Sequence, residues 1–239
     1  MAGYKYIRYP TIAKFPNILR SVPGTQNPCT QKENQMKALI MFYSTYGHVF
    51  QLAKAVAEGV NEVAGAEAVL RKVKETLPDE IVTKLGGIEP RKAWADIPEV
   101  RVGDLEECGA LLIGTPTRFG GVCSQVRAFL DSTGGLWAKQ TMLGKIGAAF
   151  TSSGTQHGGQ EVTIYGSIYP YFLHQGMLVA GLPYAFEGQS GMEEIMGGSP
   201  YGASCIAAPD GSRQPSKVEL DGARYLGRHV AQLAVKLQK

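Results

Sequence analysis

The sequence predicts an α/β fold, a doubly wound five-stranded parallel sheet with the strand order 2-1-3-4-5. From Met36 onward, short apolar runs alternate with segments whose apolar residues recur at helical spacing. Continuous apolar runs are typical of parallel strands that are buried on both faces. In addition, three segments rich in glycine and hydroxyl groups each follow one of these runs directly. In a doubly wound sheet, such segments gather at the carboxyl edge, where ligands bind.

The first two strands and the helix between them follow Met36. A buried strand is expected at residues 37–43, and helical spacing then appears in the apolar residues Val49, Leu52, Ala53, Val56, Ala57 and Val60. Gly65 ends this helix, and residues 66–73 alternate enough to form the second strand. Residues 75–104 are expected to be a long polar connection, because glycines and prolines interrupt them repeatedly.

The third and fourth strands are expected at residues 110–114 and 146–150, with a helix at 124–131 between them. Residues 160–174 fit a helix that Pro170 interrupts, because proline lacks the amide hydrogen that a helix needs. The alternation of strands and helices therefore continues through the middle of the chain, as a doubly wound sheet requires.

Residues 177–180 are expected to form the beginning of the fifth strand, and a last helix is expected to begin after Ser216. Ser216 and Glu219 have the spacing of a capping box, in which each side chain bonds the backbone of the other. The following apolar residues recur on one helical face: Leu220, Ala223, Leu226, Val230, Leu233, Ala234 and Leu237. This helix is therefore expected to pack against the sheet.

Composition excludes several classes of protein. The chain has 239 residues, 44% of them hydrophobic and 19% charged, which is enough for one sizeable α/β domain. No apolar run approaches the length of a membrane span, so no integral membrane segment is expected. The four cysteines lie far apart and form no C-x-x-C pair: Cys29, Cys108, Cys123 and Cys205. We therefore expect no metal site, no disulfide framework and a cytoplasmic location.

The positive charge is concentrated near the N-terminus. Residues 1–35 hold five basic side chains against one acidic side chain, which leaves 19 basic and 20 acidic side chains in residues 36–239. That balance lacks the basic footprint of a nucleic-acid-binding protein. We expect residues 1–35 to be a basic N-terminal extension and residues 36–239 to be the folded domain. An organelle transit peptide and a start codon placed upstream of Met36 are the alternatives.

The turn after the first strand is the main candidate for a binding site. It reads Ser-Thr-Tyr-Gly-His-Val over residues 44–49 and leads directly into a helix, whose free N–H groups and dipole favour an anion. Hydroxyl groups add donors, and Gly47 permits close approach of the backbone. The turn lacks the lysine of a nucleotide triphosphate loop and the spaced glycines of a dinucleotide loop. A single terminal phosphate, as in flavin mononucleotide (FMN), fits best; an ordinary connection without a ligand is the alternative.

Two more loops are expected at the same edge. Residues 114–121 read Gly-Thr-Pro-Thr-Arg-Phe-Gly-Gly, and residues 151–159 read Thr-Ser-Ser-Gly-Thr-Gln-His-Gly-Gly. Both offer backbone donors and acceptors at close range, as a planar heterocycle with imide edges requires. One such loop is usually only a turn, but three at strand ends predict a shared site.

These segments together resemble the WrbA-type NAD(P)H:quinone oxidoreductases, a flavodoxin-like family. The resemblance covers residues 36–239 and is carried by YSxYGH at 43–48, GTPTRFG at 114–120, TGGLWA at 133–138, GGQE at 158–161, PYGA at 200–203 and GSRQPS at 211–216. It implies a flavodoxin-like, FMN-binding domain in a homotetramer. It further implies two-electron reduction of quinones with NAD(P)H as co-substrate, in a ping-pong hydride transfer.

The resemblance also implies a role for each matching residue. The phosphate would bind to Ser44, Thr45, Tyr46, Gly47, His48 and Val49, of which Tyr46 would also touch the nicotinamide. The isoalloxazine ring would be lined by Pro116, Thr117, Arg118, Phe119 and Gly120. The ribityl chain and ring edge would contact Ser152, Ser153, Gly154, Thr155, Gln156 and His157. His174 would reach the flavin, and Trp137 and Tyr184 would wall the substrate site, some of them from a neighbouring subunit.

The sequence departs from the family pattern at two places. Gln175 stands where a second histidine is common, and residues 154–159 are bulkier than the usual glycine run. Plainer structural roles also exist for single residues: His48 as a helix cap, Trp137 as a core aromatic and Arg118 as an ion-pair partner. His157 and His174 would then be surface or interface histidines.

Two other functions are compatible with a flavin site. One is a flavodoxin-type electron carrier, although such carriers are usually strongly acidic and this body is nearly neutral. The other is a flavin-containing adaptor whose basic extension binds a partner. The preference for NADH or NADPH, the natural quinone and the role of residues 1–35 are not determined by the sequence.

Overall fold

The computed structural model describes residues 35–238 of the chain. The described residues all belong to one compact unit, which begins at residue 33. The extension predicted at residues 1–35 thus falls, except for its last residue, outside the described part. Between residues 35 and 238, no helix is long and apolar enough to cross a membrane.

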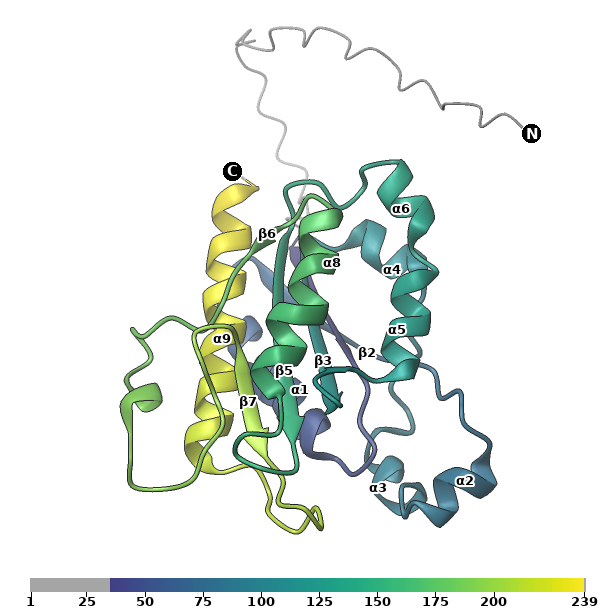
Figure 1. The fold of residues 1–239 in the computed structure, drawn as a ribbon. Coiled ribbons are helices and arrows are strands. Elements are labelled where there is room, and N and C mark those ends of the chain that lie inside the picture. Colours follow the sequence, from purple (N-terminus) through teal and green to yellow (C-terminus); the bar gives the residue numbers. More distant parts are fainter. Residues whose placement is uncertain (1–34, 239) are drawn as a thin grey trace, which may run out of the picture. The chain divides into compact units, whose positions relative to one another are not determined.

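A twisted sheet forms the centre of the described body (Figure 1). Five strands run parallel in the order β2 (Ala66–Lys72), β1 (Met36–Phe42), β3 (Ala110–Arg118), β5 (Ile146–Ser153) and β6 (Leu178–Val179). In chain order, this arrangement is 2-1-3-4-5, so the predicted doubly wound fold is confirmed. Both β3 and β5 extend beyond the strands expected from sequence, which brings Arg118 and Ser153 to strand ends.

The sheet contains two additional strands that the sequence did not reveal. β4 (Gly121–Val122) forms a short antiparallel hairpin with the end of β3. β7 (Ala203–Ile206) pairs in parallel with the second half of β5, whereas β6 pairs with its first two residues. The fifth strand of the sheet is thus divided into two short strands, β6 and β7. The segment between them, residues 180–202, leaves the sheet and contains the 3₁₀ turn η3 (Glu187–Ser190); we call it the excursion. Strands of two and four residues are too short for a recognisable period.

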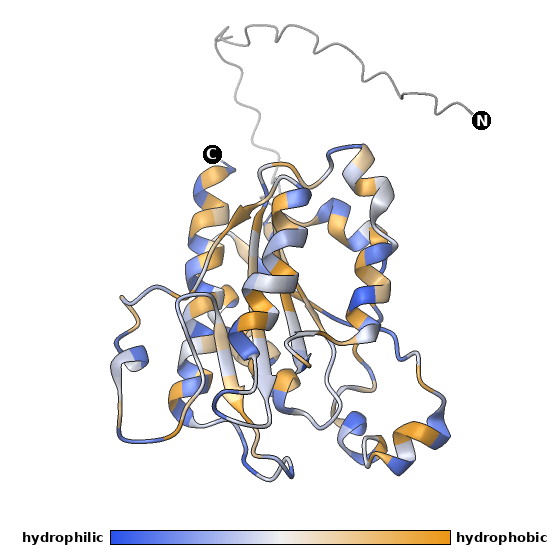
Figure 2. Cartoon of the chain, viewed as in Figure 1, coloured by the Kyte–Doolittle hydropathy of each residue, from blue (hydrophilic) through white to orange (hydrophobic). Residues whose placement is uncertain are grey.

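Each face of the sheet carries a hydrophobic core, because successive residues of a strand point to opposite faces. Ile40 belongs to the core under α1 (His48–Asn61) and α9 (Lys217–Leu237). Leu39 belongs to the other core, under α4 (Val102–Glu107), α5 (Ser124–Asp131) and α8 (Tyr169–His174). Hydrophobic and hydrophilic residues alternate along α9, as expected for an amphipathic helix (Figure 2).

The predicted polar connection at residues 75–104 contains short helices. They are α2 (Asp79–Lys84), α3 (Ile88–Arg91), the 3₁₀ turn η1 (Lys92–Trp94) and the start of α4. Elements of three to six residues show too few turns for helical periodicity to appear in the sequence. Trp94 is buried and packs against Phe50 of α1, with ring centroids 5.1 Å apart, so it anchors the segment to the body.

The helix predicted at residues 160–174 is interrupted as expected. It consists of α7 (Gln160–Thr163), a π-helical turn η2 (Ile164–Ile168) and α8. Pro170 lies in the first turn of α8. Its missing N–H and its ring prevent a regular α-helical connection to the preceding turn, and the wider π turn accommodates both.

Two glycines bring the backbones of α1 and α9 into contact. A Cβ atom on Gly227 would lie 2.1 Å from the carbonyl oxygen of Val56, and one on Gly59 would lie 1.9 Å from that of Arg224. Real side chains do not approach backbone oxygens so closely. The two helices therefore pack at this distance only because both positions lack a side chain.

We predict that Gly227→Ala lowers the free energy of unfolding by about 1–3 kcal/mol, because the added methyl group forces the two helices apart. Urea denaturation followed by circular dichroism measures this loss. Gly103→Ala is the matched control, since Gly103 lies in α4 and a Cβ there would meet nothing within 4 Å. An equal loss in both variants would contradict the steric explanation.

Candidate functional site

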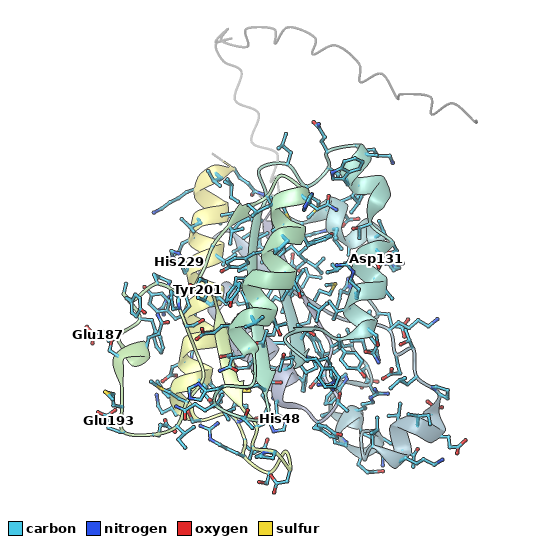
Figure 3. All side chains as sticks on the ribbon, in the orientation of Figure 1. His48, Asp131, Glu187, Glu193, Tyr201 and His229 are labelled. Atoms are coloured by element: carbon cyan, nitrogen blue, oxygen red, sulfur yellow. The ribbon has the colours of Figure 1, made fainter. Side chains whose placement is uncertain are left out.

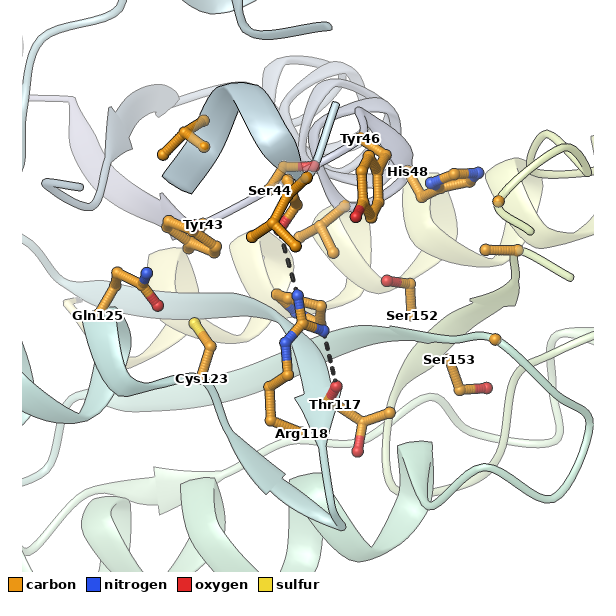
Figure 4. Close-up of a pocket in the computed structure, with 18 of the residues that line it drawn as sticks. Tyr43, Ser44, Tyr46, His48, Thr117, Arg118, Cys123, Gln125, Ser152 and Ser153 are labelled. Carbon is orange, nitrogen blue, oxygen red and sulfur yellow. Dashed lines mark hydrogen bonds between the residues drawn. The ribbon is translucent and has the colours of Figure 1, made fainter. Parts of the chain in front are cut away.

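A cavity of about 620 Å³ opens at the carboxyl edge of the sheet (Figure 4). Its walls come from the turn after β1, the ends of β3 and β5, the start of α5 and residues 207–211 after β7. It therefore lies at the predicted switch between β1 and β3. Its volume falls within the range of small-molecule sites, and both hydroxyl groups and apolar side chains line it.

The turn after β1 presents hydrogen-bond donors to this cavity. Gly47 precedes α1, and its N–H donates to Ser44 Oγ over 3.1 Å. Neither a side-chain cap nor an acidic residue occurs in the first turn of α1, so the helix start keeps N–H groups available for a ligand. Ser44, Thr45, Tyr46, His48 and Val49 all line the cavity.

The backbone conformation of Gly47 favours glycine at this position. Its φ angle is +100°, which side chains rarely adopt. A Cβ atom there would meet only the ring of Trp94, at an ordinary 3.8 Å. Close approach of the backbone to a ligand stays a prediction, and the positive φ angle is a second reason for glycine at this position.

His48 connects the turn to a fourth loop, at residues 207–213. The ring is buried, and its Nε2 donates to the carbonyl oxygen of Arg213 over 3.0 Å. The ring thus does not cap its own helix. Figure 3 shows His48 at the cavity end of the molecule, whereas Glu187 and Glu193 project from the excursion.

The fourth loop was not identified from the sequence as part of the site, although the matched segment at residues 211–216 overlaps it. It is fixed by Glu219, whose side chain is completely buried. This carboxylate accepts hydrogen bonds from the N–H groups of Gly197, Ile206 and Ser216 and pairs with Arg213 at 2.9 Å. The predicted capping box is confirmed, and it also holds one cavity wall in place.

The end of β3 supplies Pro116, Thr117 and Arg118 to the cavity. Phe119 and Gly120 form the tip of the hairpin to β4, and both have positive φ angles, as two-residue type I′ turns require. Phe119 is fully exposed and lies outside the cavity lining. An aromatic residue with a positive φ angle has a strained backbone, and such strain is common beside binding sites.

A charged network supports the opposite wall. Arg91 pairs with Glu75, and Tyr43 and Gln125 also donate to that carboxylate over 2.8 and 2.7 Å. Burial raises the pKa of Tyr43, and the neighbouring Arg91 opposes this rise. Burial likewise raises the pKa of the Cys123 thiol, so this cavity residue stays neutral at physiological pH.

Only part of the predicted loop at residues 151–159 lines the cavity. Ser152, Ser153 and Gly154 line the cavity, whereas Thr155, Gln156 and His157 are exposed outside its lining. Gln156 instead offers its carbonyl oxygen to Gln160, 2.7 Å away. The bulkier sequence of this loop therefore projects outward and does not narrow the cavity.

The residues predicted to reach the flavin or wall the substrate site, Trp137, His174 and Tyr184, also lie outside the cavity lining. Trp137 lies in α6 (Gly134–Ala138), and His174 is the last residue of α8. Each of these helices is followed by a strand that begins at the amino edge of the sheet, which is opposite the cavity and at the top of Figure 1. A bond of 2.9 Å between Gly144 N–H and the carbonyl of Gly176 joins these two connections. Tyr184 is exposed on the excursion at residues 180–202. Within residues 35–238, none of the three therefore contributes to the cavity.

Gln175, the departure from the family pattern, is buried at the same amino edge. Its Nε2 donates to Thr133 Oγ1 over 3.3 Å, and that hydroxyl also bonds the Tyr171 hydroxyl at 3.1 Å. Within residues 35–238, its Oε1 has no partner. Gln175 therefore belongs to the packing between α6 and α8 and does not line the cavity.

Several known proteins are similar to this chain in sequence. The sequence profile of the family described as NADPH-dependent FMN reductase matches residues 36–187. A Geobacter metallireducens protein named NAD(P)H dehydrogenase (quinone) is 58% identical over 203 residues, which are 85% of this chain and 100% of that protein. A protein of the same name from Geobacter sulfurreducens is 57% identical, covering 84% and 99%.

Solved structures show the same fold. A flavodoxin, WrbA-like protein from Agrobacterium tumefaciens aligns with a TM-score of 0.57 and 21% identity, covering 84% of this chain and 99% of that one. An archaeal flavodoxin aligns with a TM-score of 0.52 and 20% identity over similar shares. At these identities, the likeness concerns the fold alone.

Proposed function

The chain belongs to the NADPH-dependent FMN reductase family, among its WrbA-type NAD(P)H:quinone oxidoreductases, and we propose that it reduces quinones to hydroquinones with NAD(P)H and FMN. The observation that carries this proposal is the lysine-free turn at residues 44–49, which aims hydroxyl and N–H donors into a cavity large enough for a flavin. The hydride exchange itself is the chemistry of FMN when bound. The protein positions the rings and excludes water.

The residues of the cavity fit FMN. The α1 start with Ser44 and Thr45 would hold its phosphate, and the strand ends at Pro116–Arg118 and Ser152–Gly154 offer polar groups to the ribityl chain and ring. Phe119 stands beside the cavity as an exposed aromatic for stacking. Tyr46, which is exposed at the cavity, would touch the nicotinamide. Because proximity supplies much of the rate of such transfers, these contacts are the protein's main contribution.

The substrate walls would come from a neighbouring copy in a homotetramer. Trp137 and the apolar residues Leu143, Leu173 and Leu178 are exposed near the amino edge, where a solitary chain would leave them in water. Contact between copies would cover them and bring Trp137 and His174 toward another chain's cavity. Tyr184 or His174 would then bond the developing hydroquinone oxygen. Cytoplasmic placement is consistent with three buried free thiols among the described residues.

Gly47→Val is expected to weaken FMN binding at least about tenfold, or roughly 1.4 kcal/mol, because valine disfavours a φ of +100° and distorts the donor turn. Fluorescence titration with FMN measures the affinity. Gly198→Val is the matched control, with a φ of +106° and open space around the position, on the excursion away from the cavity. Equal FMN affinity in both variants would remove the turn from the site.

Turnover is expected to be ping-pong, because one slot beside the flavin would take first the nicotinamide and then the quinone. Initial rates with NADH and benzoquinone should give parallel double-reciprocal lines. An absorption spectrum of the purified protein, recorded first, establishes its flavin content. Intersecting lines would show that both substrates bind together, and absence of NADH consumption would favour an electron carrier.

Residues 36–239 are expected to fold, bind FMN and reduce quinone without the extension, because the described body contains the whole sheet and cavity. Light scattering of the full chain should give about four times its 25.7 kDa mass. The same measurements on the truncated chain test whether the extension is needed for assembly. A folded truncation that loses flavin or turnover would make the extension part of the enzyme.

A further inference from the structure

We propose that residues 77–85 form a hydrocarbon-binding subsite of the cavity, which holds the alkyl or isoprenoid tail of a lipid-soluble quinone. This inference rests on the proposed function and specifies the class of quinone. Leu77, Ile81 and Leu85 are 38%, 39% and 48% exposed, although all three are large apolar side chains. Leu77 and Leu85 also line the cavity, so this exposed apolar surface continues into the cavity itself. We call these three side chains the apolar rim.

The short helix α2 and its flanks bring the apolar rim together. Ile81 lies in α2, Leu77 precedes the helix by two residues, and Leu85 is its C-cap residue. The N–H of Leu85 donates to the carbonyl oxygen of Ile81 over 3.0 Å, and helical residues four apart are neighbours on one side. α2 lies at the cavity end of the body, at the lower right of Figure 1.

The apolar rim stays exposed because the inner side of α2 is already filled. Val82 is 1% exposed and occupies that inner side. A Cβ atom on Gly87 would lie 3.2 Å from Val82 and 3.4 Å from Thr45, so the end of this segment packs directly on the turn after β1. On the outer side, Lys84 pairs with Glu80 over 2.6 Å, and both are largely exposed. The rim therefore lies between the buried and the charged sides of the segment, next to the cavity.

The rim differs from the other walls of the cavity. Within residues 35–238, the lining contains two leucines, Leu77 and Leu85, and both belong to the rim. The walls at residues 152–154 and 207–211 consist of small or polar side chains. A hydrocarbon tail on a ring inside the cavity therefore gains most by lying along the rim. Each methylene group that leaves water there strengthens binding about fourfold, whereas a charged or sugar-like side group would lose its hydration without gaining a partner.

The test compares two quinones with the same head group on the full chain loaded with FMN. One is dimethoxymethylbenzoquinone, which has no tail, and the other is its isoprenyl derivative. Calorimetric titration of the oxidised protein gives both dissociation constants, and initial rates with NADH give both values of kcat/KM. The wild type should bind the isoprenyl quinone about tenfold more tightly than the tailless one, because part of the tail leaves water.

Variants of the rim are compared by this preference, since the isoprenyl group also changes the reduction potential of the ring. Leu77→Ser and Leu85→Ser should each lower the preference by about threefold or more, in dissociation constants and in kcat/KM alike. Leu85→Met should retain most of it, because methionine keeps the apolar volume. Met192→Ser is the matched control and should keep the full preference, since Met192 is 94% exposed on the excursion, outside the cavity lining. Circular dichroism checks that each variant is folded.

An unchanged preference in both serine variants of the rim would overturn the subsite. If their mass by light scattering also fell, a second copy of the chain would cover the rim instead of a quinone tail. Reduction of both quinones by the wild type, with equal affinity for the two, would overturn the subsite alone. Failure of the wild type to reduce either quinone would instead overturn the proposed function.

Discussion

The unsatisfied N–H groups at the start of α1 are the constraint around which this site is organised. A helix that follows a buried strand cannot bond its first N–H groups internally, and here no side chain caps them. The doubly wound order places this helix start at the switch point, beside the ends of β3 and β5. In the proposed site, the other walls of the cavity would enclose a ligand whose anionic end lies on α1.

The fourth wall depends on a buried charge far from the ligand. Glu219 satisfies N–H groups from three chain segments and the Arg213 side chain, and the carbonyl of Arg213 then receives His48. A buried carboxylate is tolerated only when it is fully hydrogen-bonded. The same bonds thus stabilise the start of α9, the loop after β7 and the turn after β1, so helix capping and site geometry share one set of contacts.

The two arginines that line the cavity, Arg91 and Arg118, have different surroundings. Arg91 and Glu75 neutralise each other in the wall next to Tyr43, where they hold the segment after β2 against the body. Arg118 has no such partner within residues 35–238 and faces the turn after β1. Local pairing therefore decides which cation supports structure and which is free for a ligand, although both are arginines in the same cavity.

The sequence by itself determined the lysine-free turn, the capping box and the alternation of strands and helices, because each depends on local spacing. The strand order followed from that alternation through the general topology of doubly wound sheets. The sequence missed β4 and β7, which are too short to show a period, and the fourth loop, which the Arg213–Glu219 pair and the His48–Arg213 hydrogen bond hold at the cavity. Only the tertiary structure showed that Arg118 turns toward Thr45 and that Trp137 and His174 lie at the far edge. Side-chain direction and the spacing of distant segments arise from packing, and no local pattern encodes them.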